Sequence, residues 1–282
     1  AALASSLNII AGYTGYIDFG NAVFLGLGAY TTGILSTHYS VPLPLGMLAG
    51  SALASLYALL LGLPILRLRG HYFAIATIGV MEATRELIIN AEGLTGGGTG
   101  LTLPITTMDP RSFNSLIYYV MLALFLVYVL LSALIRRSRF GYGLRAIRAD
   151  EEAAEVSGIN TTRFKVLAWM TSAAMTGLVG GVYAYWYSYI QPGDVFNSLV
   201  TVKYLIMTLI GGAGTVLGPV VGAFLLELIS ETVWSRFLEW HLMVLGGIIV
   251  LVVIFMPRGI VPMLRRGFSI KSWWAEIRQN RI

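Results

Sequence analysis

Cysteine is absent from the 282-residue sequence, and charged residues are scarce. Without a thiol the chain can form no disulfide bond, no thiolate metal site and no cysteine nucleophile. Asp, Glu, Lys and Arg make up 12% of the residues, against roughly 25% in soluble domains. Hydrophobic residues reach 56%, and the mean hydropathy is +0.75. This composition argues against a soluble enzyme and indicates a protein whose main solvent is lipid.

Long runs without a charged residue predict the spans. Each run is close to or longer than the ~20 residues that cross a hydrocarbon core of about 30 Å as a helix. Because backbone polar groups must be paired inside a bilayer, we expect an all-α fold, a polytopic transmembrane helical bundle in one domain over residues 1–282. About nine spans are predicted: the first dozen residues as the end of one, then 21–38, 43–66, 70–90, 113–135, 166–188, 199–211, 219–230 and 241–257.

The segments 199–211 and 219–230 are too short for two full spans. The connection around them is rich in glycine and contains one proline: Gly211, Gly212, Gly214, Gly218 and Pro219. We therefore interpret these two segments as a hairpin that turns near or inside the membrane, so that the bundle includes re-entrant or broken helices.

Positive charge is concentrated on one side of the predicted membrane. Fifteen of the 19 Lys and Arg residues fall within 67–69, 136–165 and 258–281, which carry a net charge of +10, whereas the rest of the chain carries −5. Since cytoplasmic loops of membrane proteins hold the excess of Lys and Arg, these three segments are predicted to be cytoplasmic. The loops expected outside are 39–42, 91–112, 189–198 and 231–240. The pI near 9.5 thus reflects topology rather than nucleic-acid binding.

Residues 136–165 form a cytoplasmic connection long enough to hold structure of its own. Asp150 is placed to cap a short helix, acids follow in the first turns where the helix dipole favours them, and Gly158 is placed to end it. Asn160 or Thr161 would then cap the next helix. Composition alone leaves two interpretations open: a solvated, charged loop helix that only anchors the topology, or a rigid lever on which another protein docks.

Five stretches in order resemble a known family. They read LNIIAGYTGYIDFGNAVFLGLGAY at 7–30, RLRGHYFAIATIG at 67–79, LTGGGTGL at 94–101, SRFGYGLRAIRADEEAAEVSGIN at 138–160 and GGAGTVLGPVVGA at 211–223. Together they are similar to the LivM-type permeases of the branched-chain amino acid ABC transporter family over nearly the whole chain. In the first stretch this sequence has Asp18 and Asn21 where the family commonly has Ser and His.

The resemblance implies a transport subunit without catalysis of its own. The fourth stretch is similar to the E-A-A…G segment of ABC-importer permeases, whose short helix inserts into a groove of the ATPase subunit. The residues implied in ATPase coupling are Glu152, Ala153, Ala154, Gly158 and Ile159. Implied partners are a LivH-like second permease, two ATPase subunits that hold ATP and Mg, an external solute-binding protein and the lipid of a prokaryotic inner membrane. No nucleic acid and no cofactor on this chain are implied.

Glycines in the first and last of these stretches permit close helix approach and irregular backbone at membrane depth. Such backbone is tolerated where protein or a water-filled path satisfies it. We expect a translocation path lined by broken helices, although glycine-mediated packing alone explains any single glycine equally well. The candidate path residues are Gly12, Tyr13, Gly15, Asp18, Gly20, Gly212, Gly214 and Gly218. We also interpret the two stretches as corresponding elements of a same-sense internal repeat.

Other polar features are less specific. Glu82, Arg85 and Glu86 have helical spacing, so the acids can flank the guanidinium as a neutralised structural group or as a functional charge cluster. Asp18 could shape the path or bond to freed backbone amides. The 94–100 run lacks the Lys and Ser or Thr of a nucleotide-binding loop and is expected to be an external turn.

The remaining polar and aromatic signals fall at the ends of spans. The histidines are scattered there, which argues against a metal site. The tail 263–282, with Trp273 and Trp274, suits an amphipathic helix at the cytoplasmic interface.

Two functions from different classes remain. The first is a permease subunit of an ABC importer for branched-chain or related amino acids, with urea or short amides as other substrates of such permeases. The second is a secondary transporter or channel that works alone, with Asp18 or the Glu82 group coupled to an ion. The second would explain the membrane charges but not the segment around Glu152.

Overall fold

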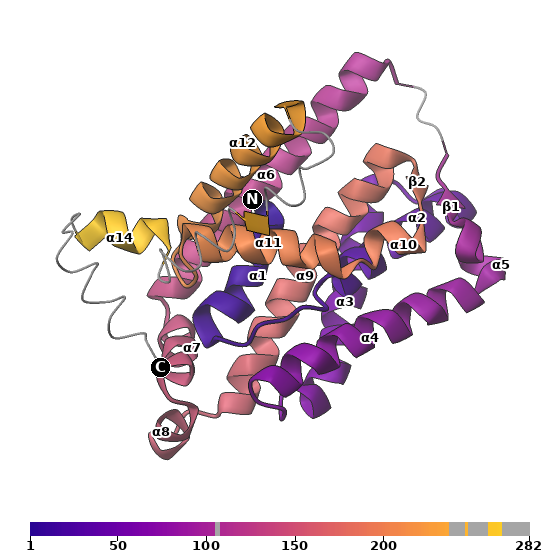
Figure 1. The fold of residues 1–282 in the computed structure, drawn as a ribbon. Coiled ribbons are helices and arrows are strands. Elements are labelled where there is room, and N and C mark those ends of the chain that lie inside the picture. The colour runs from indigo at the N-terminus through magenta and orange to yellow at the C-terminus, as the bar shows by residue number, and fades with distance from the viewer. Residues whose placement is uncertain (105–107, 237–245, 248–258, 267–282) are drawn as a thin grey trace.

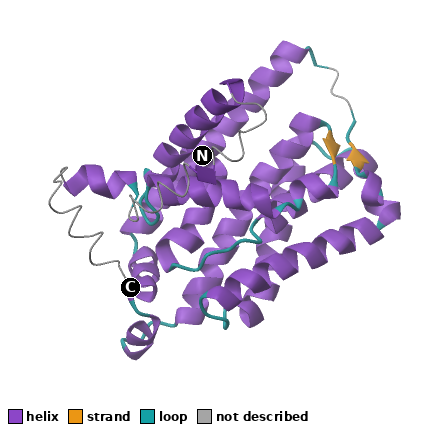
Figure 2. Cartoon of the chain, viewed as in Figure 1, coloured by secondary structure: helices purple, strands orange, loops and turns teal. Residues whose placement is uncertain are grey.

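The fold is almost entirely helical (Figures 1 and 2). The computed structural model describes residues 1–104, 108–236, 246–247 and 259–266. The α-helices are α1 Ala2–Leu7, α2 Ala22–Tyr39, α3 Leu43–Ile65, α4 His71–Asn90, α5 Glu92–Thr95, α6 Pro110–Arg137, α7 Arg139–Ala149, α8 Glu151–Val156, α9 Thr161–Tyr187, α10 Pro192–Val195, α11 Ser198–Gly211, α12 Gly218–Arg236 and α14 Ile260–Arg266. A π-helix, η1, covers Asn8–Gly12, and a 3-10 helix, η2, covers Gly97–Thr99. The predicted all-α fold is confirmed.

In the part of the chain that the structure describes, four segments are long and apolar enough to cross a membrane by length and composition: Leu43–Ile65, Pro110–Arg137, Thr161–Tyr187 and Pro192–Gly211. Residues Ala2–Gly12 form a shorter apolar helix. Helices α2 and α4 have 18 and 20 residues, enough for about 27 and 30 Å at 1.5 Å per residue. Helix α4 includes Glu82, Arg85 and Glu86, which lowers its apolar character. The chain is a multi-pass membrane protein.

Helix α9 is the central element of the bundle and packs on α2 and α3 (Figure 1). Small residues let these helices approach closely, because a Cβ on Gly177 of α9 would meet Ala54 and the Gly50 carbonyl of α3. On the same helix Trp169 packs edge-on against Phe24 of α2, with ring centroids 5.5 Å apart. Glycine contacts and one large aromatic side chain therefore fix α9 against its neighbours.

The helices extend beyond several predicted spans. Helix α9 begins at Thr161 rather than 166, and α12 continues to Arg236 rather than 230. The predicted ends were set by the nearest charges, whereas a helix can continue past its apolar part with charged residues outside the hydrocarbon core. The predicted span 241–257 lies outside the described residues, as does the tail from 267, which includes Trp273 and Trp274.

A small antiparallel strand pair closes the end of the bundle opposite α8. Strands β1 Leu101–Thr102 and β2 Tyr189–Ile190 pair with Leu101 opposite Ile190. Gly100 precedes β1 with φ +82°, and a Cβ there would meet the Ile190 carbonyl, so the turn at this point requires glycine. The glycine run 94–100 thus joins α4 to this strand pair.

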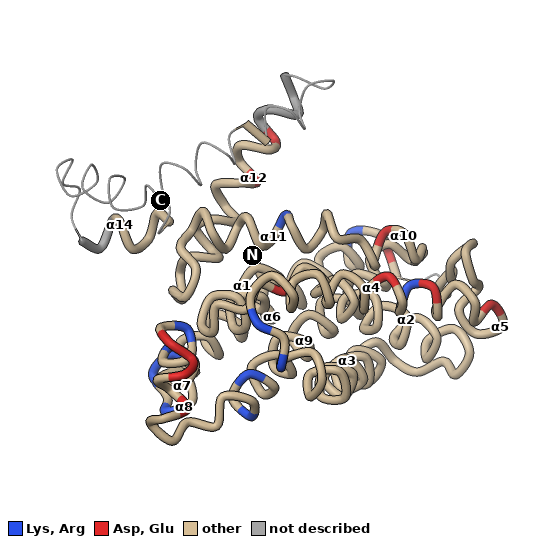
Figure 3. The backbone as a smooth tube through the Cα atoms, turned by 60° about the horizontal axis from the view of Figure 1, so that its bottom comes forward, with Lys and Arg blue, Asp and Glu red and all other residues tan. Residues whose placement is uncertain are grey.

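Many of the charged residues lie toward the two ends of the bundle (Figure 3). In the view shown, α7, α8 and the beginning of α9 carry many of the basic residues at one end, together with acids of α8. Charges of α4, α5 and α10 lie at the other end. The cluster at α7 and α8 corresponds to the predicted cytoplasmic segment 136–165.

Candidate coupling helix and glycine turns

Helix α8 has the caps that the sequence predicts. The Asp150 carboxylate accepts hydrogen bonds from the backbone N–H groups of Glu152 and Ala153, both at 3.0 Å. At the other end Gly158 adopts φ +84°, and the N–H of Ile159 donates to the Ala154 carbonyl at 3.0 Å. This is a glycine-terminated helix end. Asn160, one of the two predicted caps, accepts a bond from the Arg163 N–H and begins α9.

Helix α7 was missed by the sequence analysis, which placed only one short helix in 136–165. Ser138 caps it by accepting a hydrogen bond from the Gly141 N–H at 3.2 Å. Gly141 and Gly143 lie within α7, and glycine there lowers helix propensity. Both are required by packing, since a Cβ on Gly143 would meet the Phe164 ring. Ser138 in the pattern Ser-x-x-Gly is therefore a helix cap that was not recognised from the sequence.

The five residues implied in ATPase coupling differ in exposure. Glu152, Ala153 and Gly158 are exposed, Ile159 is half-buried, and Ala154 is buried at 4%. Ala154 therefore packs toward the protein rather than toward a docking partner. Val156, which the sequence analysis did not select, is 91% exposed at the end of α8. An apolar side chain presented this way, in a segment that charge predicts to be cytoplasmic, is a candidate contact for a partner.

A buried charge cluster ties α8 to the membrane helices. The Lys165 ammonium, with its side chain 3% exposed, donates to Glu151 Oε1 at 2.7 Å, to the Tyr16 hydroxyl at 3.0 Å and to the Leu66 carbonyl at 2.8 Å. The Tyr16 hydroxyl donates to Glu151 Oε2 at 2.6 Å. Burial of Glu151 acts to raise its pKa, but the hydrogen bonds from Lys165 and Tyr16 outweigh it and hold the pKa below its usual value. Glu151 is therefore anionic at neutral pH.

A second ion pair on α8 provides a contrast. Arg69 Nη1 lies 2.9 Å from Glu152 Oε1, but the two side chains are 54% and 78% exposed. Exposed pairs are screened by water and contribute at most about 1 kcal/mol. Two adjacent acids of α8 thus have different environments, one in a buried network and one at the surface.

Two irregular turns interrupt the helices on the same side of the bundle as α7. The first turn, 13–21, joins η1 to α2, and the second turn, 212–217, joins α11 to α12. Asn8 joins η1, which leads into the first turn, to the second turn, because its side chain donates to the Thr215 carbonyl at 2.9 Å and accepts from the Gly214 N–H at 2.8 Å. Asn8 lies in the π-helix η1, and π-helical segments occur often at functional sites.

Arg148 of α7 bonds to the last residue of η1, directly before the first turn, and to the second turn. Its Nη1 donates to the Gly12 carbonyl and, at 3.2 Å, to the Ala213 carbonyl. Burial lowers the pKa of this guanidinium from its ordinary value. A Cβ on Gly214, which has φ +82°, would meet Arg148 and the Gly12 carbonyl. The absence of side chains at Gly12 and Gly214 lets the arginine reach both backbones.

The predicted path residues take part in several separate contacts rather than in one. Gly12 and Gly214 come together, and Gly212 and Gly218 face each other across the second turn, since a Cβ on Gly218 would meet the Gly212 carbonyl. Gly15 has φ +81° and lies near Arg148. Gly20 packs on the Thr77 carbonyl of α4. Tyr13 is buried, and its hydroxyl donates to the Ser132 carbonyl of α6 at 3.2 Å.

Asp18 is fully buried in the first turn. Its carboxylate accepts hydrogen bonds from the Trp169 indole at 2.7 Å, the Asn21 amide at 3.0 Å and the Gly20 N–H at 3.1 Å. One of the two predicted roles, bonding to a backbone amide that the irregular turn leaves free, therefore corresponds to an observed contact. The carboxylate also fixes the turn to α9 through Trp169.

The charge group on α4, Glu82, Arg85 and Glu86, contains an ion pair whose side chains are partly exposed. Arg85 Nη1 lies 3.1 Å from Glu82 Oε2, with side chains 35% and 51% exposed.

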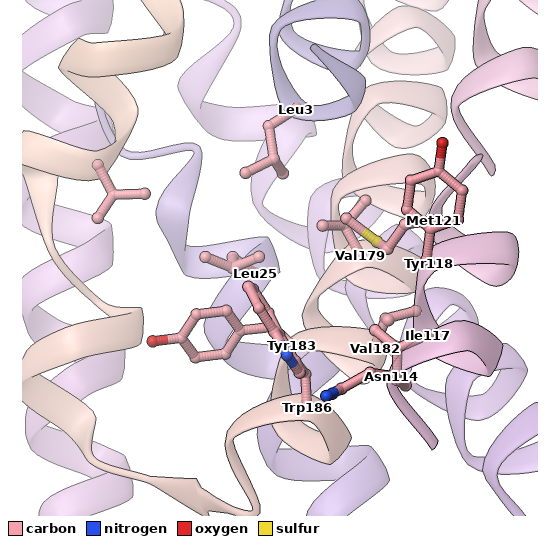
Figure 4. A pocket seen from close by; sticks show the side chains of 11 residues that line it. Leu3, Leu25, Asn114, Ile117, Tyr118, Met121, Val179, Val182, Tyr183 and Trp186 are labelled. Atoms are coloured by element: carbon pink, nitrogen blue, oxygen red, sulfur yellow. The ribbon is translucent and has the colours of Figure 1, made fainter. Parts of the chain in front are cut away.

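A cavity of about 610 Å³ lies elsewhere, between α1, α2, α6, α9 and α11 (Figure 4). Uncharged side chains line it, among them Leu3, Met121, Val179, Tyr183 and Trp186. Among the described lining residues none is charged, so the cavity offers an ion pair to neither end of a zwitterion. In the described part of the chain no three metal-ligating side chains are grouped together.

Helical spans interrupted by glycine turns, with a capped helix exposed beside them, define this chain as a polytopic helical membrane protein. The family model described as branched-chain amino acid transport system / permease component matches residues 1–253, and the chain belongs to that family. It is thus a transport subunit and not an enzyme. No solved structure matches the chain significantly.

Curated relatives agree with this assignment. The chain is 31% identical over 304 residues to the high-affinity branched-chain amino acid transport system permease protein LivM of Salmonella typhimurium, covering 97% of this chain and 70% of that protein. It is 27% identical over 190 residues to LivH of the same organism, covering 65% and 58%. It is also 26% identical over 192 residues to the ribose import permease protein RbsC of Bacillus subtilis, covering 65% and 59%. These relatives support a permease component rather than a transporter that works alone.

Proposed function

We propose that this chain is one of the two permease subunits of an ABC importer in a prokaryotic plasma membrane and carries branched-chain amino acids inward. The relatives named for branched-chain amino acid transport include separate LivM and LivH permeases, which supports a pair in which the second subunit is LivH-like. ATP and Mg would be held by two ATPase subunits, and an external solute-binding protein would deliver the substrate. Similarity to a ribose permease makes substrate class the part that most needs measurement.

The observation that carries the coupling role is the outward face of α8. Glu152, Ala153 and Val156 are exposed on a helix whose caps and buried Ala154 fix it to the protein. A short helix that is held at both ends can move as a rigid unit and transmit a displacement without bending. When the ATPases close on ATP, α8 would move as a rigid body and the glycine turns beside it would change their packing, which is a two-state rearrangement of packed elements.

Val156→Glu tests this docking surface. A carboxylate at a contact that excludes water is unfavourable, so we expect the variant to lose ATPase binding and leucine uptake in the assembled transporter. Tyr39→Glu is the matched control, because Tyr39 is 69% exposed at the opposite end of the bundle and should leave ATPase binding unchanged. Co-purification of the ATPase subunits and uptake into proteoliposomes give the two readouts. Normal ATPase binding by Val156→Glu would remove this face of α8 from the docking site.

Equilibrium binding of leucine, isoleucine, valine and ribose to the cognate solute-binding protein tests the substrate class. We expect binding of the three branched-chain amino acids and none of ribose. Binding of ribose alone would assign the chain to sugar import while leaving its permease role intact.

A further inference from the structure

The Lys165 cluster connects elements that are far apart in the sequence. An ammonium has three N–H donors, and each donor of Lys165 meets an acceptor on a different element: Glu151 on α8, Tyr16 in the first turn and the Leu66 carbonyl at the end of α3. The Lys165 ammonium also lies 4.6 Å from the centre of the Tyr16 ring. Separation of Glu151 or Tyr16 from Lys165 would remove a partner from a buried charge.

From Tyr16 the contacts continue to the far side of the same turn. The Tyr16 ring packs edge-on against Phe73 of α4 with centroids 5.2 Å apart, and Phe73 packs against Trp169 of α9 at 5.8 Å. The Trp169 indole donates to Asp18. Glu151 of α8 is therefore connected to Asp18 through an unbroken series of hydrogen bonds and ring contacts.

We propose that Lys165 is a positioning residue that couples α8 to the first turn. By holding Glu151 and Tyr16 together it makes a displacement of α8 displace Tyr16, and with it the backbone between η1 and α2. Lys165 acts through Tyr16 and makes no contact with substrate in this role. The inference rests on the proposed function, because it assumes that α8 is the element on which the ATPases act.

The exposed Arg69–Glu152 pair shows what the cluster adds. It joins the same helix to the connection between α3 and α4 at a similar distance, 2.9 Å, but in water. Long exposed side chains can separate at little cost and so transmit little displacement. The buried cluster differs because the Lys165 ammonium, on a side chain 3% exposed, has almost no water to replace a lost partner. Arg69→Gln is therefore the matched control.

The test compares Tyr16→Phe, Lys165→Met, the double variant Glu151→Gln/Lys165→Met, and Arg69→Gln. Each is assembled with the second permease, the ATPases and the solute-binding protein in proteoliposomes, and leucine uptake and ATP hydrolysis are measured together. Tyr16→Phe removes one hydroxyl, and the double variant removes the link without leaving a lone buried charge. We expect transport per ATP hydrolysed to fall at least about five-fold in the first three variants, with hydrolysis continuing, and to stay at the wild-type value in Arg69→Gln.

Uncoupled hydrolysis is a readout that a merely structural role would not produce. The proposal is overturned if Tyr16→Phe and the double variant transport per ATP within about two-fold of the wild type, a change below usual coupling free energies. It is also overturned if these variants fail only in assembly, which would make the cluster a folding element. Absence of ATP-driven uptake in the wild-type complex would instead contradict the proposed function itself.

Discussion

At the scale of single residues, Lys165 is held in an environment that its charge tolerates only when fully paired. Removing one partner from a buried pair leaves a charge that neither water nor protein compensates. We therefore expect Lys165→Met, which leaves Glu151 without its main partner, to lower the free energy of unfolding by about 3 kcal/mol. Arg69→Gln, at the exposed pair, should lower it by less than about 1 kcal/mol. Denaturant unfolding in detergent measures both, and equal losses would show that burial does not distinguish the pairs.

The pH dependence of stability follows from Glu151. Its pKa in the folded protein lies below that of the unfolded chain, about 4.3 for a free glutamate. The unfolded state thus binds the proton first, so the stabilisation is complete above that pH and is lost as the pH falls through the folded pKa. We expect wild-type stability to be unaffected by this group between pH 7 and about 5 and to fall below pH ~4. In Glu151→Gln the loss of stability at acid pH should be smaller. An equal loss in the variant and the wild type would show that Glu151 is not the group responsible.

The sequence predicted residue-level features that depend on neighbours along the chain. Asp150, Gly158 and Asn160 cap or end helices within three residues of themselves, and all three are found in these roles. The partnership of Tyr16 with Lys165 could not be predicted, because 149 residues separate them and it depends on how α9 packs. A lysine at the beginning of a predicted span suggested only an anchor for sidedness.

At the scale of elements, the end of η1 and the second glycine turn are held together through backbone contacts that exclude side chains. Gly214→Ala would place a methyl group against Arg148 and the Gly12 carbonyl at a φ of +82°. We expect it to destabilise the protein by about 1–3 kcal/mol through backbone strain. Gly79→Ala in α4 is the control, since a Cβ there meets nothing within 4 Å, and alanine favours helix by up to ~1 kcal/mol. In thermal unfolding, Gly214→Ala should have a lower unfolding temperature than Gly79→Ala. Equal unfolding temperatures would argue against tight packing at the second turn.

Helix positions were predicted well where apolar runs and helices coincide. Helices α2, α3 and α4 begin and end within about a residue of their predicted spans, because turns rich in Gly, Pro or charge flank them. Helix α12 and the beginning of α9 were underestimated because charged residues are compatible with helix. Helix α7 was missed because its glycines, which serve packing against α6 and α9, read as helix breakers.

At the scale of the whole molecule, charge predicts which side of the membrane each end faces. A cysteine-free chain allows single cysteines to report this without background. Tyr142 of α7 and Tyr39 at the end of α2 are 63% and 69% exposed. An impermeant maleimide should label Tyr39→Cys on intact cells and Tyr142→Cys only after permeabilisation, because the segment rich in Arg is retained in the cytoplasm. Labelling of Tyr142→Cys on intact cells would invert the topology.

We expect this chain to transport only as part of an ATP-driven assembly. The most direct measurement is uptake of labelled leucine into proteoliposomes that contain this chain and its second permease, with and without the ATPase subunits and ATP. We expect uptake only when the ATPase subunits, ATP and the solute-binding protein are all present. Uptake driven by an ion gradient in the absence of the ATPases would contradict the account and establish a transporter that works alone.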